Sequence, residues 1–213
     1  MSEFSLTLSG ISKEFNRRSI FKDISVVLGT RESLAITGRN GSGKSTLVKI
    51  ICGVLSPSKG TISFKRTDGA IAYEEMRNQI GFVSPYLQLY DEFSALENLG
   101  LLSAIRSDPK LDGERIDASL RDVGLWERRN DLVRTYSSGM KQRLKYAFAF
   151  MHRPALLVLD EPTSNLDLDG IEMVERIVAE QKRSAMLIVA TNDASEAAWC
   201  DKRIELGVNV RGK

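Results

Sequence analysis

The sequence contains few of the residues that mark secreted, metal-binding or membrane-spanning proteins. It has one histidine and two cysteines, and no apolar run approaches the ~20 residues that a transmembrane helix requires. Cys52 and Cys200 lack metal-ligand spacing, so we interpret them as reduced packing residues. The first residues lack the basic-then-apolar pattern of a leader, and we expect no signal peptide. We therefore expect a cytoplasmic protein, with any membrane-spanning part supplied by another polypeptide.

A strong excess of charge of either sign is also absent. The formal net charge is +2, and the basic residues form only short pairs such as Arg17-Arg18 and Arg128-Arg129. A nucleic-acid surface needs a strong basic patch, so we expect no nucleic-acid partner. The 213 residues, of which 42% are hydrophobic, suit a single domain that carries an inserted lobe.

A glycine-rich segment between a strand pattern and a helix pattern is the most informative feature. The spacing G-x-x-x-x-G-K-S follows the apolar run 33–37 and precedes a helical pattern. In this context glycines let successive N–H groups point into one concavity, and the helix dipole adds positive potential there. The spacing therefore predicts a nucleoside triphosphate site. The predicted binding residues are Gly38, Arg39, Asn40, Gly41, Ser42, Gly43, Lys44, Ser45 and Thr46.

The remaining patterns predict an α/β fold with a P-loop core. Short strands are expected in the first part of the chain, at 4–8, 24–28, 34–37, 61–64 and 80–83, and further strands at 156–159 and 186–190. The continuous apolar strands that alternate with helices predict a mostly parallel sheet covered on both faces, preceded by an antiparallel N-terminal region.

Helical patterns dominate the middle of the chain. Ser94 and Glu97 form a capping box that would begin the first helix of this stretch. We therefore expect one domain, 1–213, in which a helical lobe at 86–135 is inserted into a core made of 1–85 and 136–213.

Two carboxylates follow one of the buried strand patterns. Asp160 and Glu161 come directly after 156–159, and ligands of parallel sheets collect at the carboxyl ends of strands. Asp160 would bind Mg²⁺ directly or through water, and Glu161 could take a proton from an attacking water. The alternative is that the two acids only solvate a turn.

A second helix start carries hydroxyl side chains. Tyr136-Ser137-Ser138-Gly139 precedes an amphipathic helix pattern. A serine at this position normally caps the helix. The same free amides and hydroxyls can also receive a phosphate group.

The order of these motifs resembles the ATP-binding subunit of ABC transporters over nearly the whole chain. Residues 136–140, Tyr-Ser-Ser-Gly-Met, resemble a variant of that family's signature, and the run through Arg143 is most similar to exporter subunits, including bacterial haem-export-like ATPases. The resemblance implies ATP and Mg²⁺ as cofactors. It also implies head-to-tail pairing with a second cassette, as a homodimer or a heterodimer, in which Ser137 and Gly139 of one copy close over the ATP of the other.

The resemblance further implies roles for individual residues. Ser45 and Asp160 would order Mg²⁺, Glu161 would be the catalytic base, and Lys44 would stabilise charge on the γ-phosphate. Asp167 falls in the segment that corresponds to the family's D-loop. Phe15 falls where family members stack an aromatic ring on adenine, although it can also be read as a packing residue.

The chain departs from the family pattern at two positions. Pro85 stands where relatives usually have a glutamine, and Gln88, three residues later, is a possible substitute. Asn192 stands where relatives have a histidine; asparagine can donate a hydrogen bond to a γ-phosphate but cannot become a cation. Our hypothesis is that the subunit binds Mg·ATP and hydrolyses it slowly, or only in its full complex.

These expectations describe the ATPase subunit of a membrane exporter, peripheral on the inner face of the cell membrane. The multi-spanning permease partner would insert a helix beside an apolar cluster that can also be read as lobe core: Tyr86, Leu87, Leu89, Tyr90 and Phe93. Two alternatives stay open. One is a regulatory nucleotide-binding cassette paired with a more active partner, and the other is a soluble ABC ATPase without a membrane domain.

Overall fold

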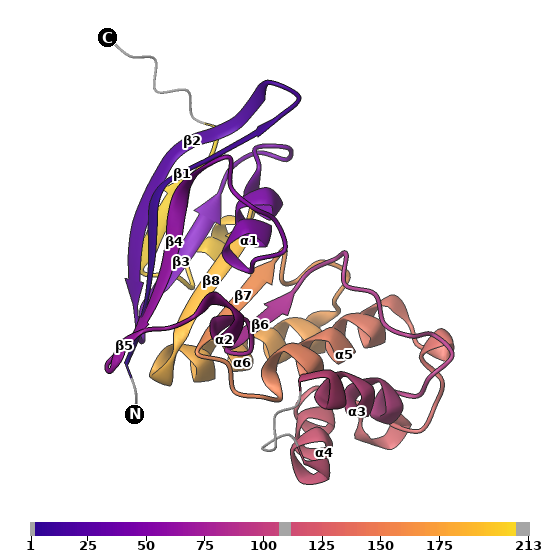
Figure 1. Ribbon diagram of the computed structural model, residues 1–213. Coiled ribbons are helices and arrows are strands. Elements are labelled where there is room, and N and C mark those ends of the chain that lie inside the picture. The colour runs from indigo at the N-terminus through magenta and orange to yellow at the C-terminus, as the bar shows by residue number, and fades with distance from the viewer. Residues whose placement is uncertain (1–2, 107–111, 208–213) are drawn as a thin grey trace.

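The computed structural model of the chain describes residues 3–106 and 112–207 (Figure 1). Two of the predictions concern residues outside this part. Residues 1–2 begin the segment for which no leader is expected, and residues 107–111 belong to the predicted lobe.

An antiparallel sheet forms the N-terminal layer. Its strand order is β2-β1-β4-β5, with β1 at Phe4–Phe15, β2 at Arg18–Gly29, β4 at Lys59–Arg66 and β5 at Gly69–Ala70. The strands β1 and β2 are much longer than the short strands expected from the apolar pattern. Asn16 and Arg17, with φ of 48° and 63°, make the tight turn between them without glycine. The expected antiparallel region is thus confirmed.

A parallel sheet forms the centre of the fold. Its order is β6-β7-β8-β3-β9, with β3 at Ser33–Thr37, β6 at Ile80–Val83, β7 at Leu156–Asp160, β8 at Met186–Thr191 and β9 at Lys202–Glu205. All four neighbouring pairs are parallel. Every residue of β3, β7 and β8 is buried, as the continuous apolar patterns predicted. The edge strand β9 was not expected, because its exposed residues alternate with half-buried ones.

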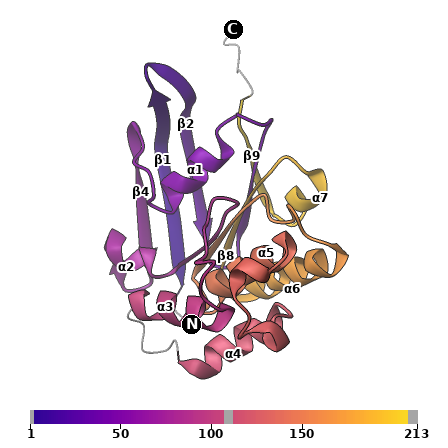
Figure 2. The same ribbon diagram turned by 90° about the vertical axis from the view of Figure 1, so that its right-hand side faces the viewer.

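Helices cover both faces of the parallel sheet. Their bounds are Lys44–Ile51 (α1), Tyr73–Arg77 (α2), Ala95–Arg106 (α3), Gly113–Asp122 (α4), Ser138–Phe150 (α5), Leu168–Ser184 (α6) and Ala194–Ala197 (α7). Short 3-10 helices lie at Trp126–Arg128 and Val133–Thr135. Figures 1 and 2 show α1 on the side of the antiparallel sheet, and α5 and α6 on the other side.

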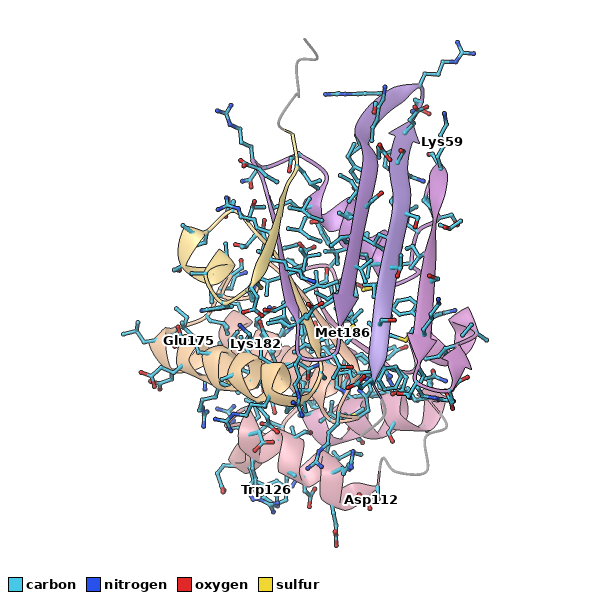
Figure 3. All side chains as sticks on the ribbon, turned by 90° about the vertical axis from the view of Figure 1, so that its left-hand side faces the viewer. Lys59, Asp112, Trp126, Glu175, Lys182 and Met186 are labelled. Carbon is cyan, nitrogen blue, oxygen red and sulfur yellow. The ribbon has the colours of Figure 1, made fainter. Side chains whose placement is uncertain are left out.

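Two hydrophobic cores lie on opposite faces of the parallel sheet, because alternate side chains of each strand point to opposite faces. On β8, Ile188 packs with α1 and the antiparallel sheet, whereas Leu187 and Val189 pack with α5 and α6. Figure 3 looks onto the antiparallel sheet, with Lys59 at one end of β4 and with α6, which carries Glu175 and Lys182, passing below.

The helical lobe shares the second of these cores. The predicted capping box is confirmed: the Ser94 amide donates to Glu97 Oε2 at 2.8 Å, and the Glu97 amide donates to Ser94 Oγ at 3.1 Å. Leu99 of α3 and Leu120 of α4 belong to the same buried cluster as Leu144 of α5. The lobe is therefore packed onto α5, the helix that begins at the predicted signature.

Candidate nucleotide-binding site

The glycine-rich loop connects β3 to α1 at the carboxyl end of the central strand. Gly43 has φ of 101°, and a Cβ atom there would lie 2.5 Å from the Ile20 side chain. Only glycine therefore fits between β2 and the start of α1. The first turn of α1 has no side-chain cap and no acidic residue. Its leading amides thus point out of the helix with the positive dipole end, which is the condition for receiving an anion.

Lys44 lies curled against the loop that it follows. It is 5% exposed, and its Nζ donates to the backbone oxygens of Gly38 at 2.9 Å and Arg39 at 3.4 Å. The loop thus holds a buried ammonium group among its own backbone atoms. This places a positive charge beside the amides of the helix start.

Ser45 and Asp160 connect α1 to the end of β7. Ser45 Oγ donates to Asp160 Oδ1 across 3.1 Å, and Asp160 Oδ2 is a buried oxygen without a hydrogen-bond partner among the described residues. Burial raises the pKa of Asp160, and the hydrogen bond from Ser45 opposes that shift. An unpartnered carboxylate oxygen beside a hydroxyl is a donor set that suits Mg²⁺, which takes few protein ligands when phosphate oxygens supply others. The residues present therefore fit the expected cation.

Glu161 follows Asp160 in a strained backbone conformation. Its φ is 51°, a region that non-glycine residues rarely occupy, and its amide donates to the Ala190 oxygen at 2.9 Å. The Glu161 side chain is half-buried and lies at the carboxyl end of β7, directly after Asp160. Strain of this kind is retained where the surroundings hold it, commonly at functional sites.

Asn192 contacts the phosphate loop directly. The strands β8 and β3 are neighbours, and Asn192 Nδ2 donates to Asn40 Oδ1 at 3.1 Å. Both residues line a hollow of about 440 Å³ that also contacts Gly38 and Arg39. Asn192 and Asn40 belong to separate predicted motifs, and their contact was not predicted.

Phe15 lies near the end of the β1–β2 hairpin. Its side chain is 45% exposed and belongs to neither core, so it is not a packing residue of the interior. Lys13 Nζ lies 4.8 Å from its ring and also donates to the Ser56 oxygen at 2.7 Å, in the loop after α1. An exposed ring is available for stacking, and its contact with adenine stays a prediction.

The predicted signature lies at the start of α5. Ser137 caps the helix, its Oγ accepting from the Met140 amide at 3.1 Å, so the capping role is present. Ser137 is exposed and Gly139 half-buried, and among the described residues no hydrogen bond joins either of them to 38–46. The structure thus does not bring the signature and the phosphate loop of one chain together.

Asp167 is engaged within its own chain. It caps α6 by accepting from the Gly170 amide at 2.9 Å, and it accepts from Arg143 Nη2 at 2.6 Å. The bond from Arg143 is the main cause of the lowered pKa of Asp167. These contacts give Asp167 a structural role that the sequence did not indicate; a contact with nucleotide stays a prediction.

The segment after β6 is held by α5 rather than by the phosphate loop. Lys145 Nζ donates to the Pro85 oxygen at 3.1 Å. Gln88 is exposed and lines a groove of about 360 Å³ together with Lys141 and Lys145. No hydrogen bond among the described residues joins Gln88 to the phosphate loop. Instead, Tyr86 approaches α1, with its ring 4.5 Å from Lys49 Nζ.

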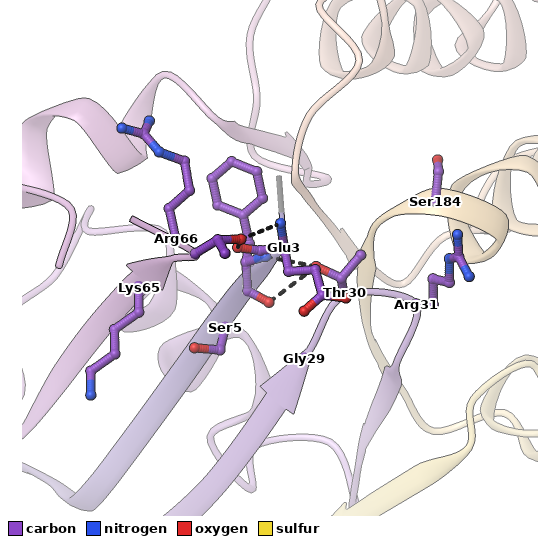
Figure 4. A pocket seen from close by; sticks show the side chains of 10 residues that line it. Glu3, Ser5, Gly29, Thr30, Arg31, Lys65, Arg66 and Ser184 are labelled. Atoms are coloured by element: carbon purple, nitrogen blue, oxygen red, sulfur yellow. Dashed lines mark hydrogen bonds between the residues drawn. The ribbon is translucent and has the colours of Figure 1, made fainter. Parts of the chain in front are cut away.

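A larger hollow lies at the opposite end of the sheets, away from the glycine-rich loop and from Asp160 and Glu161. It has a volume of about 780 Å³ and lies between the start of β1, the turn after β2, the end of β4 and the end of α6 (Figure 4). Its basic side chains Arg31, Lys65 and Arg66 point away from one another in the close-up. We therefore place the functional site at the carboxyl end of the parallel sheet.

The fold and this site define a class of protein: a P-loop nucleotide-binding domain with a helical insertion. The comparisons with known proteins then identify the family. The ABC transporter family matches residues 21–164. The lipoprotein-releasing system ATP-binding protein LolD of Hydrogenovibrio crunogenus is 34% identical, over 97% of this chain and 95% of its own. The chain belongs to the ABC transporter ATP-binding proteins.

Other relatives carry different names. The uncharacterized ABC transporter ATP-binding protein YdbJ of Bacillus subtilis is 33% identical over 96% of the chain and 67% of its own length. The aliphatic sulfonates import protein SsuB of Burkholderia ambifaria is 36% identical over 94% of the chain, which spans 60% of SsuB. Among solved structures, the dimeric bacterial cassette MJ0796 matches with a TM-score of 0.81 at 25% identity, covering 94% of each chain.

Proposed function

We propose that the chain is the ATP-binding and ATP-hydrolysing subunit of a membrane transporter, in which Mg·ATP drives the closure of two cassettes. The observation that carries the proposal is the hydrogen bond of 3.1 Å between Ser45 and Asp160, which joins the phosphate loop to the strand end where Glu161 is held in a strained conformation. A nucleotide-binding loop, a cation-binding oxygen pair and a candidate base thus share one edge of the sheet.

The residues would divide the chemistry among them. The leading amides of α1 and the ammonium group of Lys44 would hold the phosphate tail and stabilise charge that develops on the γ-phosphate. Ser45 and Asp160 would hold Mg²⁺, which neutralises phosphate charge. Glu161 would take a proton from the attacking water, and Asn192 would donate to a γ-phosphate oxygen. Phe15 would stack on the adenine ring.

A second cassette would complete the site. Ser137 and Gly139 lie at an accessible helix start, and within the described part of the chain no hydrogen bond joins them to the phosphate loop. Helix α5 presents its positive dipole end there. An ATP molecule held by one copy could meet this helix start of another copy. The match to a dimeric cassette supports this arrangement. Homodimer and heterodimer both satisfy it.

The membrane partner would dock beside the segment that follows β6. Tyr86 is 69% exposed and Tyr90 53% exposed, whereas Leu89 packs partly against the lobe core. Leu89 therefore fits the interpretation as lobe core, and the two tyrosine rings are available for the proposed docking. The side chain of Asn98 holds the loop by accepting from the Tyr90 amide at 2.9 Å. Exposed aromatic rings on a fixed loop are typical of contact surfaces.

We place the cassette at the inner face of the membrane, where a multi-spanning permease would hold it. In the described part of the chain, no helix has the length and apolarity to cross a bilayer. The likeness to haem-export-like subunits rests on the signature alone, and the relatives named above include a lipoprotein-releasing protein and a sulfonate importer. Export therefore remains our proposal from the signature, and the substrate belongs to the permease.

The experiment compares the wild type with Glu161→Gln. The purified wild type should release phosphate from Mg·ATP, and the variant should bind Mg·ATP, release no phosphate and accumulate as a dimer in light scattering. The variant with Mg·ADP serves as the control and should stay monomeric. A Glu161→Gln protein that remains monomeric with saturating Mg·ATP would contradict closure between two copies of this chain.

A regulatory cassette is the second candidate, and Pro85 and Asn192 favour it, because both replace residues that relatives use around the γ-phosphate. In that case the chain alone would bind Mg·ATP without hydrolysis and would dimerise only with a motif-complete cassette. A soluble ABC ATPase would instead hydrolyse ATP and would not co-purify with membranes.

A further inference from the structure

Glu196, in the short helix α7, is a buried carboxylate with no assigned part in nucleotide binding. It is 5% exposed. Its Oε1 accepts from the Thr163 amide at 3.1 Å and from the Thr163 hydroxyl, and its Oε2 accepts from the Thr191 hydroxyl. A buried carboxylate is costly unless donors satisfy it, and here both oxygens are engaged.

All of these donors belong to the two segments that carry the candidate catalytic side chains. Thr163 lies in the turn that begins at Glu161, closed by the Ser164 amide donating to the Glu161 oxygen at 3.2 Å. Thr191 is the last residue of β8 and immediately precedes Asn192. One carboxylate therefore holds together the turn of the candidate base and the turn of the candidate γ-phosphate donor.

Helix α7 is fixed in turn by the second of these segments. Asp193 caps α7 by accepting from the Ser195 amide at 2.6 Å, and its own amide donates to Thr191 Oγ1 at 2.9 Å. Thr191 thus donates to Glu196 and accepts from Asp193. The helix cannot shift without moving the end of β8.

The signature helix α5 reaches the same turn through Tyr146. Its hydroxyl donates to the Pro162 oxygen at 2.8 Å, within the fully buried interior. Burial, and then the charge of Glu196, raise the pKa of Tyr146 well above its ordinary value, so the hydroxyl remains a donor. Pro162 and Thr163 are consequently held from both sides, by α5 and by α7.

We infer that Glu196 is a positioning residue for ATP hydrolysis, which keeps Glu161 and Asn192 in one fixed arrangement around the γ-phosphate. The strained φ of Glu161 needs such support, because a free turn would relax to an ordinary conformation. This inference rests on the proposed hydrolytic function. Nucleotide affinity should depend little on Glu196, because its bonds do not reach the phosphate loop.

The test compares Glu196→Ala and Glu196→Gln with a matched control, Gln181→Leu. Gln181 is also buried and also bridges two segments, its Nε2 donating to the oxygens of Pro154 at 3.1 Å and Met186 at 2.9 Å. Those segments lie at the opposite ends of β7 and β8. The control therefore loses a comparable buried bridge far from the site.

The measurements are kcat and KM for Mg·ATP, Tm, and hydrogen exchange of 161–164 and 191–193. Glu196→Ala should lower kcat on the order of 10²-fold with KM nearly unchanged, because a small displacement of catalytic groups has that effect. Both segments should exchange faster. The kcat of Glu196→Gln should lie between those of Glu196→Ala and the wild type. The glutamine Oε1 can still accept from Thr163, whereas its Nε2 is a donor and cannot accept from Thr191. Gln181→Leu should lower Tm but leave kcat and both segments unchanged.

Different results would overturn this inference and the proposed function. Absence of phosphate release by the wild type would overturn hydrolysis, while the exchange data would still decide whether Glu196 joins the two segments. Unchanged kcat in Glu196→Ala, or faster exchange in only one segment, would overturn the inference. If the alanine variant does not fold, the glutamine variant decides, and a wild-type kcat in that variant would refute the positioning role.

Discussion

The side chain of Asn192 donates to the side chain of Asn40 across 3.1 Å, which joins the end of β8 to the phosphate loop. The relationship is between two neutral amides, so no charge is available from Asn192 when negative charge develops on the γ-phosphate. A histidine at this position could supply a cation near neutral pH.

The first prediction concerns the rate of hydrolysis. Asn192→His should raise kcat for phosphate release by about 10-fold, because a protonated histidine would donate a charge-assisted hydrogen bond where the asparagine amide donates a neutral, weaker one. The measurement is a phosphate-release assay on the purified protein. Asn192→Gln is the control, because it keeps an amide and should not accelerate the reaction. No acceleration by histidine would show that asparagine is an adequate replacement.

The second prediction separates the two roles of Ser137. Ser137→Ala should cost about 1 kcal/mol of stability through loss of the helix cap, and it should prevent the Mg·ATP dimer in the Glu161→Gln background. Asp112→Ala is the control, because Asp112 caps α4 by accepting from the Arg115 amide at 3.0 Å. That variant should lose similar stability and still dimerise. Dimers of equal abundance in both variants would leave Ser137 with a capping role only.

Much of the fold could be predicted because short contiguous patterns of residues determine individual strands and helix starts. The strand Ile80–Val83 and the capping box of Ser94 and Glu97 follow from contiguous patterns, and the structure confirms both. The length of the β1–β2 hairpin was missed, since Asn16 and Arg17 adopt positive φ without the glycine that usually signals such a turn.

The contacts inside the site could be predicted only in part. The approach of Ser45 to Asp160 follows from two motifs at the carboxyl ends of parallel strands. The bonds of Glu196 join residues 33 positions apart, and no local pattern marks a glutamate in a polar stretch as buried. The pairing of Asp167 with Arg143 was likewise invisible before α5 and α6 were placed side by side.

The third prediction concerns the packing of β6 on α5. A Cβ atom at Gly81 would lie 2.1 Å from the Ala149 backbone oxygen, so Gly81→Ala should destabilise the protein by about 1–3 kcal/mol. Gly100→Ala, within α3, meets nothing within 4 Å and should instead stabilise by about 0.5–1 kcal/mol. Urea unfolding measures both. Equal stability of the two variants would contradict this account of the packing.

The last prediction concerns pH. Asp201 accepts from the buried Ser33 hydroxyl at 2.5 Å and from Lys182 at 3.1 Å, and these contacts lower its pKa below the ordinary value of 3.8. A lowered pKa stabilises the fold above that value, and the contribution is lost as the pH falls through the folded-state pKa. Asp201→Asn should therefore cost about 1 kcal/mol at pH 7, discounted for solvent screening, and the difference from wild type in urea unfolding should shrink as the pH falls below 3.8. Asp68→Asn, an exposed carboxylate paired with Arg66, should show a smaller difference at pH 7. A cost for Asp201→Asn that is independent of pH would assign its effect to packing rather than to charge.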